Sequence, residues 1–232
     1  MKVVFLNTWN GKMRAEIEPF IREQSQDADI FCLQEVYPEM RALCQQWLSD
    51  YQEFYAYKFI VKDDDFPQAT YVRKSMPGLE SEIVLENEPN CGLGINVRFQ
   101  TKNGILNVCN FHGAAFPGDK LDNPNRLKQS ERLIDFFRQR DGQKIIGGDF
   151  NLLNNTQSVR MFSENGYADL IHDFEIKTTR NRLAWEMYPD SKQFYSDFVF
   201  VSPEVKIEQF MVPENEISDH LPIIMEIEIN KA

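Results

Sequence analysis

The sequence is poor in histidine and cysteine, the residues that build compact zinc sites. Its 232 residues include 3 His and 4 Cys, and no two Cys form a C-x-x-C pair. Structural zinc sites draw most of their four ligands from these two residue types. The composition therefore argues against a tight zinc cage, and the cysteines are expected to be buried free thiols in a reducing compartment.

Long apolar runs are also missing. The N-terminal segment MKVVFLNTWNGKM has too short an apolar stretch for a signal peptide. No segment approaches the roughly 18 apolar residues of a membrane-spanning helix, and none is a hydrophobic amphipathic helix suited to a membrane surface. These absences favour a cytoplasmic protein with no membrane partner, and a monomer is the default expectation.

Basic residues are fewer than acidic residues. Lys and Arg number 25 against 36 Asp and Glu, the formal net charge is −11, and the basic residues form no cluster. Proteins that bind long nucleic acids normally present a basic face, because neutralised phosphates supply most of the affinity. The charge balance weakens a long nucleic acid as the substrate without excluding it, since a local basic patch can occur in an acidic protein.

Core-forming residues, by contrast, are abundant. The chain contains 18 Phe, and 42% of its residues are hydrophobic, which is typical of a folded globular protein. No repeat, linker or low-complexity segment divides it, so residues 1–232 are interpreted as one domain.

Short β-rich runs alternate with helical patterns, which indicates a mixed α/β fold. Pro19 is expected to break or shorten the first helix, and Asp63–Asp65 is expected to be a solvated loop. The predicted strands are Lys2–Leu6, Asp29–Leu33, Tyr51–Val61, Ala69–Arg73, Ile83–Leu85, Leu93–Phe99, Ile105–Phe111, Lys144–Ile146, Tyr195–Val201, Val205–Met211 and Ile223–Ile229, and the predicted helices are Met13–Gln24, Pro38–Leu48, Asn125–Gln139 and Gln157–Glu164.

Polar clusters accompany many of the apolar runs. If those runs are neighbouring strands, the clusters converge on one pocket at the rim of a sheet. Carboxylates and carboxamides there would suit Mg²⁺, which prefers oxygen ligands and keeps several waters, and imidazoles would stabilise charge developing on phosphorus. The clusters are Asn7, Gln34-Glu35, Asn110-Phe111-His112, Gly147 to Asn151, Ser196-Asp197-Phe198 and Ser218-Asp219-His220.

The ordered set LNTWN, LQEV, NFHG, GGDFN, SDFVF and ISDHLPI resembles the six motif blocks of the endonuclease/exonuclease/phosphatase superfamily. The blocks run from Asn7 to His220. An isolated N-x-H is weak evidence, GDFN after an apolar strand is fairly specific, and SDHxP near the C-terminus is more so. The resemblance implies an α/β (α+β) fold of four layers, in which two packed mixed β-sheets are flanked by helices.

The resemblance also implies a metal-binding group. Glu35 resembles the family's principal metal-binding glutamate, and Asp219 resembles its second metal-linked carboxylate. Asn7 looks like the residue that shares the metal and phosphate environment. The implied cofactor is Mg²⁺, with Mn²⁺ as a substitute.

The remaining matches imply catalytic and phosphate-binding roles. Asp149 looks like the carboxylate that orients the attacking water, and Asn151 looks like the amide that steadies the phosphate or the leaving group. His112 and His220 occupy the places of side chains that contact the scissile phosphate. Asp197 looks like the buttress of His220, and a carboxylate that accepts one imidazole N–H favours the charged ring.

Two further segments have open interpretations. Arg126 and Gln129 match an R-x-x-Q pattern that follows the histidine block, so Arg126 either reaches the substrate phosphate or is an ordinary helix arginine. Arg180, Arg182 and Trp185 either line the pocket, with Arg binding phosphate and Trp stacking on a ring, or belong to a loop that a buried Trp anchors.

Two parts of the chain match no block. His172 is expected to be structural or exposed. Within Tyr51–Glu88, only Gln68–Met76 loosely resembles the strand and basic turn of the family pattern, and insertions in such loops often set substrate choice.

The implied reaction is hydrolysis of a phosphate ester by in-line attack of water, without a covalent enzyme intermediate. A compact acidic chain favours a phosphodiesterase or nuclease that acts on a short or flexible substrate. The alternatives are a small-molecule or inositol-type phosphatase and, in a different class, a non-catalytic binding module that retains the fold. A binding module has no need to keep Asp149 together with Asp197 and His220.

Overall fold

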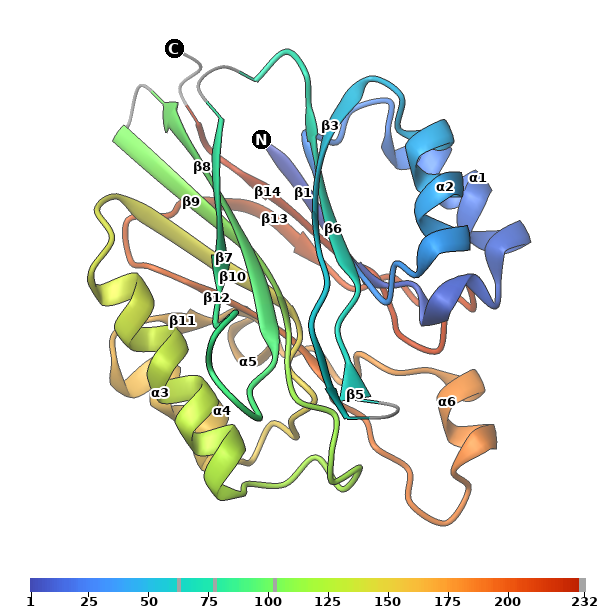
Figure 1. Cartoon of the computed structure of the whole chain (residues 1–232), viewed down its shortest axis with the longest axis vertical. Helices are drawn as coiled ribbons and strands as arrows, with labels where there is room; N and C mark the ends of the chain where they lie inside the picture. Colours follow the sequence, from blue (N-terminus) through green and yellow to red (C-terminus); the bar gives the residue numbers. More distant parts are fainter. Residues whose placement is uncertain (62–63, 77–78, 102–103, 230–232) are drawn as a thin grey trace.

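The chain forms two mixed six-stranded β-sheets that pack face to face and carry helices on their outer sides (Figure 1). This computed structural model describes residues 1–61, 64–76, 79–101 and 104–229. The expected four-layer α/β sandwich is confirmed. None of the helices in the described ranges is long and apolar enough to cross a membrane.

The first sheet has the strand order β13-β14-β1-β2-β6-β3. Its strands β1 and β2 run parallel, and the other neighbouring pairs are antiparallel. The strands are β1 (Lys2–Asn7), β2 (Ile30–Gln34), β3 (Tyr51–Ala56), β6 (Gln68–Arg73), β13 (Ile207–Met211) and β14 (Ile223–Ile227).

The second sheet has the strand order β11-β12-β10-β9-β8-β7. Here β9 and β10 run parallel, and the other neighbouring pairs are antiparallel. The strands are β7 (Glu80–Val84), β8 (Leu93–Thr101), β9 (Gly104–His112), β10 (Gln143–Asp149), β11 (Ala168–Asp169) and β12 (Asp197–Val201). The strands predicted at Leu93–Phe99 and Ile105–Phe111 are β8 and β9, which pair as an antiparallel hairpin. Lys102 and Asn103, between them, lie outside the described residues.

Helices α1 (Arg14–Gln24) and α2 (Pro38–Trp47) cover the first sheet, and α3 (Pro124–Arg138) and α4 (Gln157–Glu164) cover the second (Figure 1). Pro19 lies inside α1 and does not end it, contrary to the prediction. It projects from the exposed side while the opposite side packs Ile17 and Ile21 into the core, so the packing outweighs the lost hydrogen bond. The elements η1 (Trp9–Gly11), α5 (Leu170–Asp173), α6 (Arg182–Met187) and β11 were not predicted.

The Tyr51–Val61 segment was predicted as one strand, but it is two, β3 and β4 (Phe59–Val61). Strand β4 pairs with β5 (Asp64–Asp65) in a separate two-stranded ribbon. The loop prediction for Asp63–Asp65 is therefore wrong for its last two residues, and Asp63 lies outside the described residues. Asp65 accepts a hydrogen bond of 2.5 Å from the hydroxyl of Tyr37, the residue before α2, which ties the ribbon to the start of that helix.

Strand β1 shows why the central strands are apolar on both faces. Val3 and Phe5 belong to the cluster between the two sheets, whereas Val4 and Leu6 point outward into the cluster beneath α1 and α2. Successive side chains of a strand alternate between faces, so a strand covered on both sides needs a continuous apolar run.

The strand register places the polar clusters at one rim. In the first sheet Asn7 pairs with Gln34, and in the second Asp149 pairs with both His112 and Asp197. The carboxyl ends of β1, β2, β9 and β10 therefore share the end of the sandwich opposite the chain termini (Figure 1).

Gly148 allows β10 to approach its neighbours at this rim. Its φ is +130°, and a Cβ atom there would lie 2.2 Å from the Phe111 carbonyl oxygen. A larger residue would therefore push β9 and β10 apart next to Asp149.

Gly148→Ala is expected to lower the free energy of unfolding by more than about 2 kcal/mol, because it combines a backbone clash with an unfavourable φ. Denaturant titration measures this value. Gly118→Ala is the control, since a Cβ at Gly118 meets no atom within 4 Å. Equal stability of the two variants would contradict the steric reason given for Gly148.

Candidate active site

The rim holds a cavity of about 610 Å³ that gathers side chains from distant parts of the chain. The residues predicted from the motif blocks that line it are Glu35, His112, Asp149, Asn151, Asp219 and His220. Asn7 and Asp197 are buried against these residues. The predicted convergence of the blocks is thus seen in the structure.

Asn7 connects the two sheets beneath the cavity. Its Nδ2 atom donates to Glu35 Oε1 at 3.1 Å and to Asp149 Oδ2 at 2.9 Å, and its Oδ1 atom accepts from the Trp9 backbone N–H at 3.0 Å. The carboxamide is therefore held at both ends, and it fixes the spacing between the two carboxylates.

Asp149 is the most heavily hydrogen-bonded carboxylate of the cavity. Its Oδ1 atom accepts from Ser196 Oγ at 2.6 Å and from the Asn151 backbone N–H at 2.9 Å. Its Oδ2 atom lies 3.8 Å from His112 Nε2 and 3.6 Å from His220 Nε2. Burial alone would raise the pKa of Asp149, but His220, Lys120, His112 and the Ser196 hydrogen bond outweigh it and hold the pKa well below its usual range.

A chain of hydrogen bonds runs through His220. Its Nδ1 atom bonds to Asp197 Oδ2 at 2.8 Å, while Arg180 Nη1 lies 2.7 Å from its Nε2 atom. Arg180 Nη2 also donates to Asp219 Oδ2 at 2.8 Å. Because a guanidinium can only donate, Nε2 is the acceptor and the ring is neutral, with its proton on Nδ1.

Burial and Arg180 lower the pKa of His220 to about 3. The prediction of a charged imidazole therefore does not hold in this arrangement. The positive charge at this corner of the cavity belongs to Arg180.

Comparison with known proteins agrees with this geometry. The sequence model of the Endonuclease/Exonuclease/phosphatase family matches residues 6–220. The chain belongs to this family. The family name covers nucleases and phosphatases, which are hydrolases of phosphate esters. None of the curated proteins compared with the chain matches it.

Several solved structures share the fold. Humanized TDP2 of D. rerio is 16% identical, with a TM-score of 0.76 and coverage of 98% of each chain. The human Nocturnin catalytic domain, determined with a bound sulfate, is 17% identical, with a TM-score of 0.73 and coverage of 99% of this chain and 94% of that one. The Bacteroides thetaiotaomicron mannosyl-6-phosphatase is 19% identical, with a TM-score of 0.69 and coverage of 98% of this chain and 99% of that one. At these identities the likeness establishes the fold.

Glu35 and Asp219 are the carboxylates of the cavity that could hold a divalent metal ion. Both line the cavity, and burial together with the Asp219 carboxylate raises the pKa of Glu35 to about 7. Two neighbouring carboxylates that repel each other would be stabilised by a cation, and carboxylate oxygens are the ligands that hard cations prefer. Asn7 steadies Glu35 from below.

A second group, Asp149, Asp197 and His220, also has ligand atoms within 4.8 Å of one another. It is a poorer metal site, because His220 Nδ1 and Asp197 are already bonded to each other. We therefore assign this group to the hydrogen-bonded network beside the metal position.

His112 is buried at the edge of the cavity. Its ring packs edge-on against Phe66, with 5.1 Å between the ring centroids, and burial lowers the pKa of His112 to about 4. A neutral ring with Nε2 toward Asp149 can act as a hydrogen-bond partner for a ligand in the cavity.

Arg126 does not line the cavity, and the prediction that it binds substrate is not supported. It is fully buried, and its guanidinium donates to the carbonyl oxygens of Ala115, Pro117 and Leu121 and to Asp119. Its donors are thus used to hold the loop between β9 and α3.

The two interpretations of residues 178–185 each hold for part of the segment. Arg180 lines the cavity, as one interpretation held. Arg182 is exposed and pairs with Glu186 and Glu216 instead. Trp185 lies outside the cavity, where its indole N–H donates to the Gln193 carbonyl at 3.0 Å, so it anchors the loop.

Sequence reasoning missed Lys120 and gave no role to Ser196. Lys120 lines the cavity and donates to Asn151 Oδ1 at 2.9 Å and to Ser196 Oγ. Ser196 precedes Asp197 in a motif block, but nothing in the segment FPGDKLDN marks Lys120, because it is an isolated lysine in a loop.

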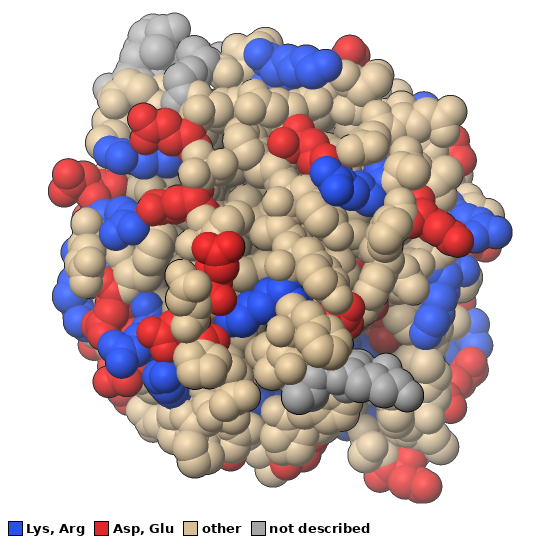
Figure 2. Space-filling view, viewed as in Figure 1, with Lys and Arg blue, Asp and Glu red and all other residues tan. Residues whose placement is uncertain are grey.

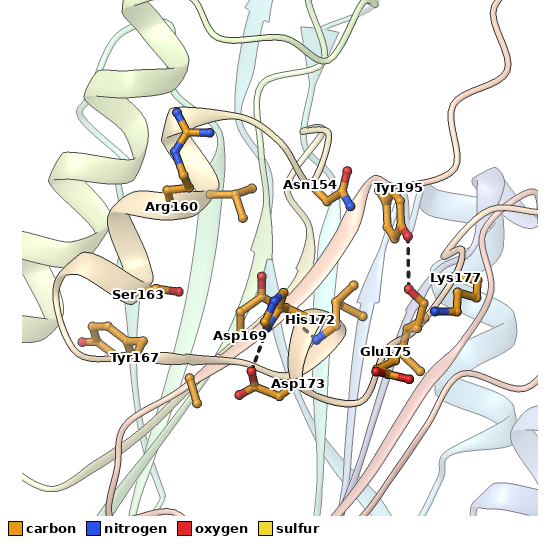
Figure 3. A pocket seen from close by; sticks show the side chains of 14 residues that line it. Asn154, Arg160, Ser163, Tyr167, Asp169, His172, Asp173, Glu175, Lys177 and Tyr195 are labelled. Atoms are coloured by element: carbon orange, nitrogen blue, oxygen red, sulfur yellow. Dashed lines mark hydrogen bonds and ion pairs between the residues drawn. The ribbon is translucent and has the colours of Figure 1, made fainter.

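A second groove, larger than the cavity at the rim, lies elsewhere on the described surface. Its volume is about 1040 Å³, and residues of α4 and α5 contribute to its wall. Figure 3 shows the polar and apolar side chains that line it. The groove includes His172, which pairs with Asp173 at 3.0 Å and whose side chain is 84% exposed. His172 is thus exposed, as expected, and shares no wall with the cavity at the rim.

Glu35→Gln is expected to stabilise the metal-free protein at about pH 8, by roughly 1–3 kcal/mol, because it removes a partly buried carboxylate that neighbouring carboxylates repel. A raised carboxyl pKa means that wild-type stability falls as the pH rises from the unfolded pKa, near 4.3, to about 7. Melting curves in EDTA test this, and the gap between variant and wild type should close near pH 4. The variant should also lose the stabilisation that Mg²⁺ gives. A variant less stable than the wild type at about pH 8 would contradict the electrostatic reason.

Proposed function

We propose that the protein is a Mg²⁺-dependent hydrolase of phosphate esters in which water attacks phosphorus in line. The observation that carries the proposal is the position of Asp149, which lies in one cavity with the Glu35 and Asp219 carboxylates and near both imidazoles. Mg²⁺ held by Glu35 and Asp219, with Asn7 beside them, would offset charge on the phosphoryl oxygens as a Lewis acid.

In this proposal Asp149 orients the attacking water. Its lowered pKa keeps the carboxylate ionised and makes it a weak base, so it is better suited to accept a hydrogen bond from water than to take its proton early. Asn7 and Ser196 fix the carboxylate from opposite sides. Asn151 lines the cavity, and the second proton of its Nδ2 atom, beside the one donated to the Gly113 carbonyl, would steady the phosphate or the leaving group.

In this proposal, Arg180 and the two imidazoles stabilise the negative charge on the phosphoryl oxygens. Arg180 supplies a permanent positive charge, and His220, fixed by Asp197, holds the guanidinium in place and presents its ring to the same region. His112 offers a neutral imidazole. Donors fixed in advance in a buried site stabilise developing charge without reorganisation.

The substrate that we favour is a short or flexible phosphodiester, including a single-stranded oligonucleotide. Phe116 and Tyr188 line the cavity mouth and are 53% and 60% exposed, and exposed rings of this kind can stack on a base. Figure 2 shows Lys and Arg scattered among Asp and Glu on the face in view, without one large basic field. That surface suits a substrate that meets the protein mainly at the cavity.

A small-molecule phosphatase is the second candidate. Lys120 and Arg180 place two buried cationic groups in one cavity, as a doubly charged phosphomonoester would require. Among the solved relatives, the Bacteroides thetaiotaomicron protein is a mannosyl-6-phosphatase. The non-catalytic binding module is disfavoured by the intact network around Asp149.

We further propose that residues 1–232 act as one catalytic domain, as a monomer in the cytoplasm. Cys32, Cys44, Cys91 and Cys109 are all free and buried, which is typical of a reducing compartment.

Asp149→Asn and His220→Asn are each expected to reduce kcat by about 100-fold or more, since each removes part of the charge-stabilising network. Hydrolysis of bis-p-nitrophenyl phosphate with Mg²⁺ measures this, and EDTA should abolish the wild-type rate. His172→Asn is the matched control and should keep the wild-type rate, because His172 lies in the other groove. Near-wild-type turnover by either active-site variant would refute its assigned role.

Hydrolysis of a short single-stranded oligonucleotide should depend weakly on salt. With about two or three phosphates contacted, log(kcat/KM) should fall with log[salt] with a slope of roughly −2, by the relation for single strands. A fluorescent oligonucleotide assayed from low to moderate NaCl tests this. A slope several-fold steeper would indicate an extended basic track and contradict the cavity-centred substrate.

A further inference from the structure

Lys120 is a buried lysine inside the candidate active site. It is 6% exposed, it lines the same cavity as Asp149, and it lies in the loop between β9 and α3. A buried ammonium is costly unless it is paired, so a functional or structural reason for its position is needed.

The loop that carries Lys120 is fixed from two sides. Arg126 binds the carbonyl oxygens of residues before and after it, at Pro117 and Leu121, and the Lys120 carbonyl accepts from the Leu153 N–H at 2.9 Å. The backbone at Lys120 has a φ of +57°, which is uncommon for a residue with a side chain. The backbone hydrogen bonds of the loop thus fix the position from which the Lys120 side chain enters the cavity.

The Lys120 ammonium has three N–H donors but only two hydrogen-bond acceptors in the described part of the chain. It donates to Asn151 Oδ1 at 2.9 Å and to Ser196 Oγ, and an ammonium carries three protons. Both partners are neutral oxygens, and no carboxylate among the described residues forms an ion pair with Lys120. One proton of the ammonium therefore remains for a ligand in the cavity, and the Lys120 charge is shared with the carboxylates around it rather than neutralised by one direct partner.

The two bonds also connect Lys120 to the residue that we propose orients the water. Ser196 Oγ accepts from Lys120, so its own proton is directed to Asp149 Oδ1, at 2.6 Å. On the other side, Asn151 Oδ1 accepts from Lys120 while Asn151 Nδ2 donates to the Gly113 carbonyl at 3.0 Å. Lys120 therefore lies between the groups assigned to the water and to the phosphate or leaving group.

We propose that Lys120 donates its remaining proton to a non-bridging phosphoryl oxygen and makes the site selective for a doubly charged terminal phosphate. For the favoured phosphodiester substrate, such a group is the monoester product of cleavage; for the second candidate function, it is the phosphomonoester substrate itself. This rests on the proposed phosphoester hydrolysis. The attraction between an ammonium and a phosphate scales with the phosphate charge, and in a buried site salt screens it little, so the dianion gains about twice as much as a diester monoanion.

The test compares binding of inorganic phosphate and dimethyl phosphate to the Mg²⁺-loaded protein by isothermal titration at about pH 7.5. Burial and Arg180 lower the pKa of Lys120 to about 8, so the side chain remains largely charged under these conditions. Lys120→Met is expected to raise the Kd of inorganic phosphate by about tenfold or more, and that of dimethyl phosphate clearly less.

Two further variants separate charge from structure. Lys120→Gln keeps a donor for Asn151 and Ser196 but removes the charge, and it should lose phosphate affinity as Lys120→Met does. Lys12→Met is the matched control, because Lys12 lines the same cavity but is exposed and stacks on the Trp9 ring at 4.2 Å. Its phosphate Kd should change by less than about twofold.

Three results would overturn the proposal. They are an unchanged phosphate Kd in both Lys120 variants, an equal loss for phosphate and dimethyl phosphate, and no phosphate binding by the wild type. Melting curves identify a variant that has lost the fold. If Lys120→Met has done so, the phosphate Kd of Lys120→Gln is the deciding measurement. If the wild type binds phosphate through Lys120 but has no metal-dependent turnover, the proposed hydrolysis fails while the phosphate site stands.

Discussion

The contact from Asn7 to Glu35 and Asp149 is the constraint on which the site depends. One carboxamide donates across the gap between the sheets, from the end of β1 to carboxylates that follow β2 and end β10. The separation of the metal-side carboxylate from the water-side carboxylate is therefore set by the packing of two sheets, not by a loop. A site built on rigid strands holds its geometry better than a site built on loops.

Charge balance explains how so many ionisable groups can be buried together. Glu35, Asp149 and Asp219 repel one another, and the raised pKa of Glu35 reflects this. Arg180, which pairs with Asp219, and Lys120 offset part of that charge. The cavity is thus arranged for ligands rather than for stability of the free protein, as functional sites often are.

Sequence reasoning succeeded where the signal was local. Apolar runs ending in polar residues located most of the strands. It failed where tertiary packing decided the outcome, as with Pro19 inside α1. Arg126 is the clearest case in the site: its R-x-x-Q spacing is local, but its direction, into the backbone of the loop, is set by that loop's path.

The sequence by itself determined the family, the apolar strands and the motif residues, because these depend on residue type and short spacing. Only the tertiary structure decided which of the remaining charges enter the cavity. Lys120 and Arg180 do so, while Arg182 turns to the surface. The protonation of His220 was likewise decided there, since it depends on Arg180, 40 residues away in the chain. Contacts over such separations follow from how the sheets and loops pack, which no local pattern encodes.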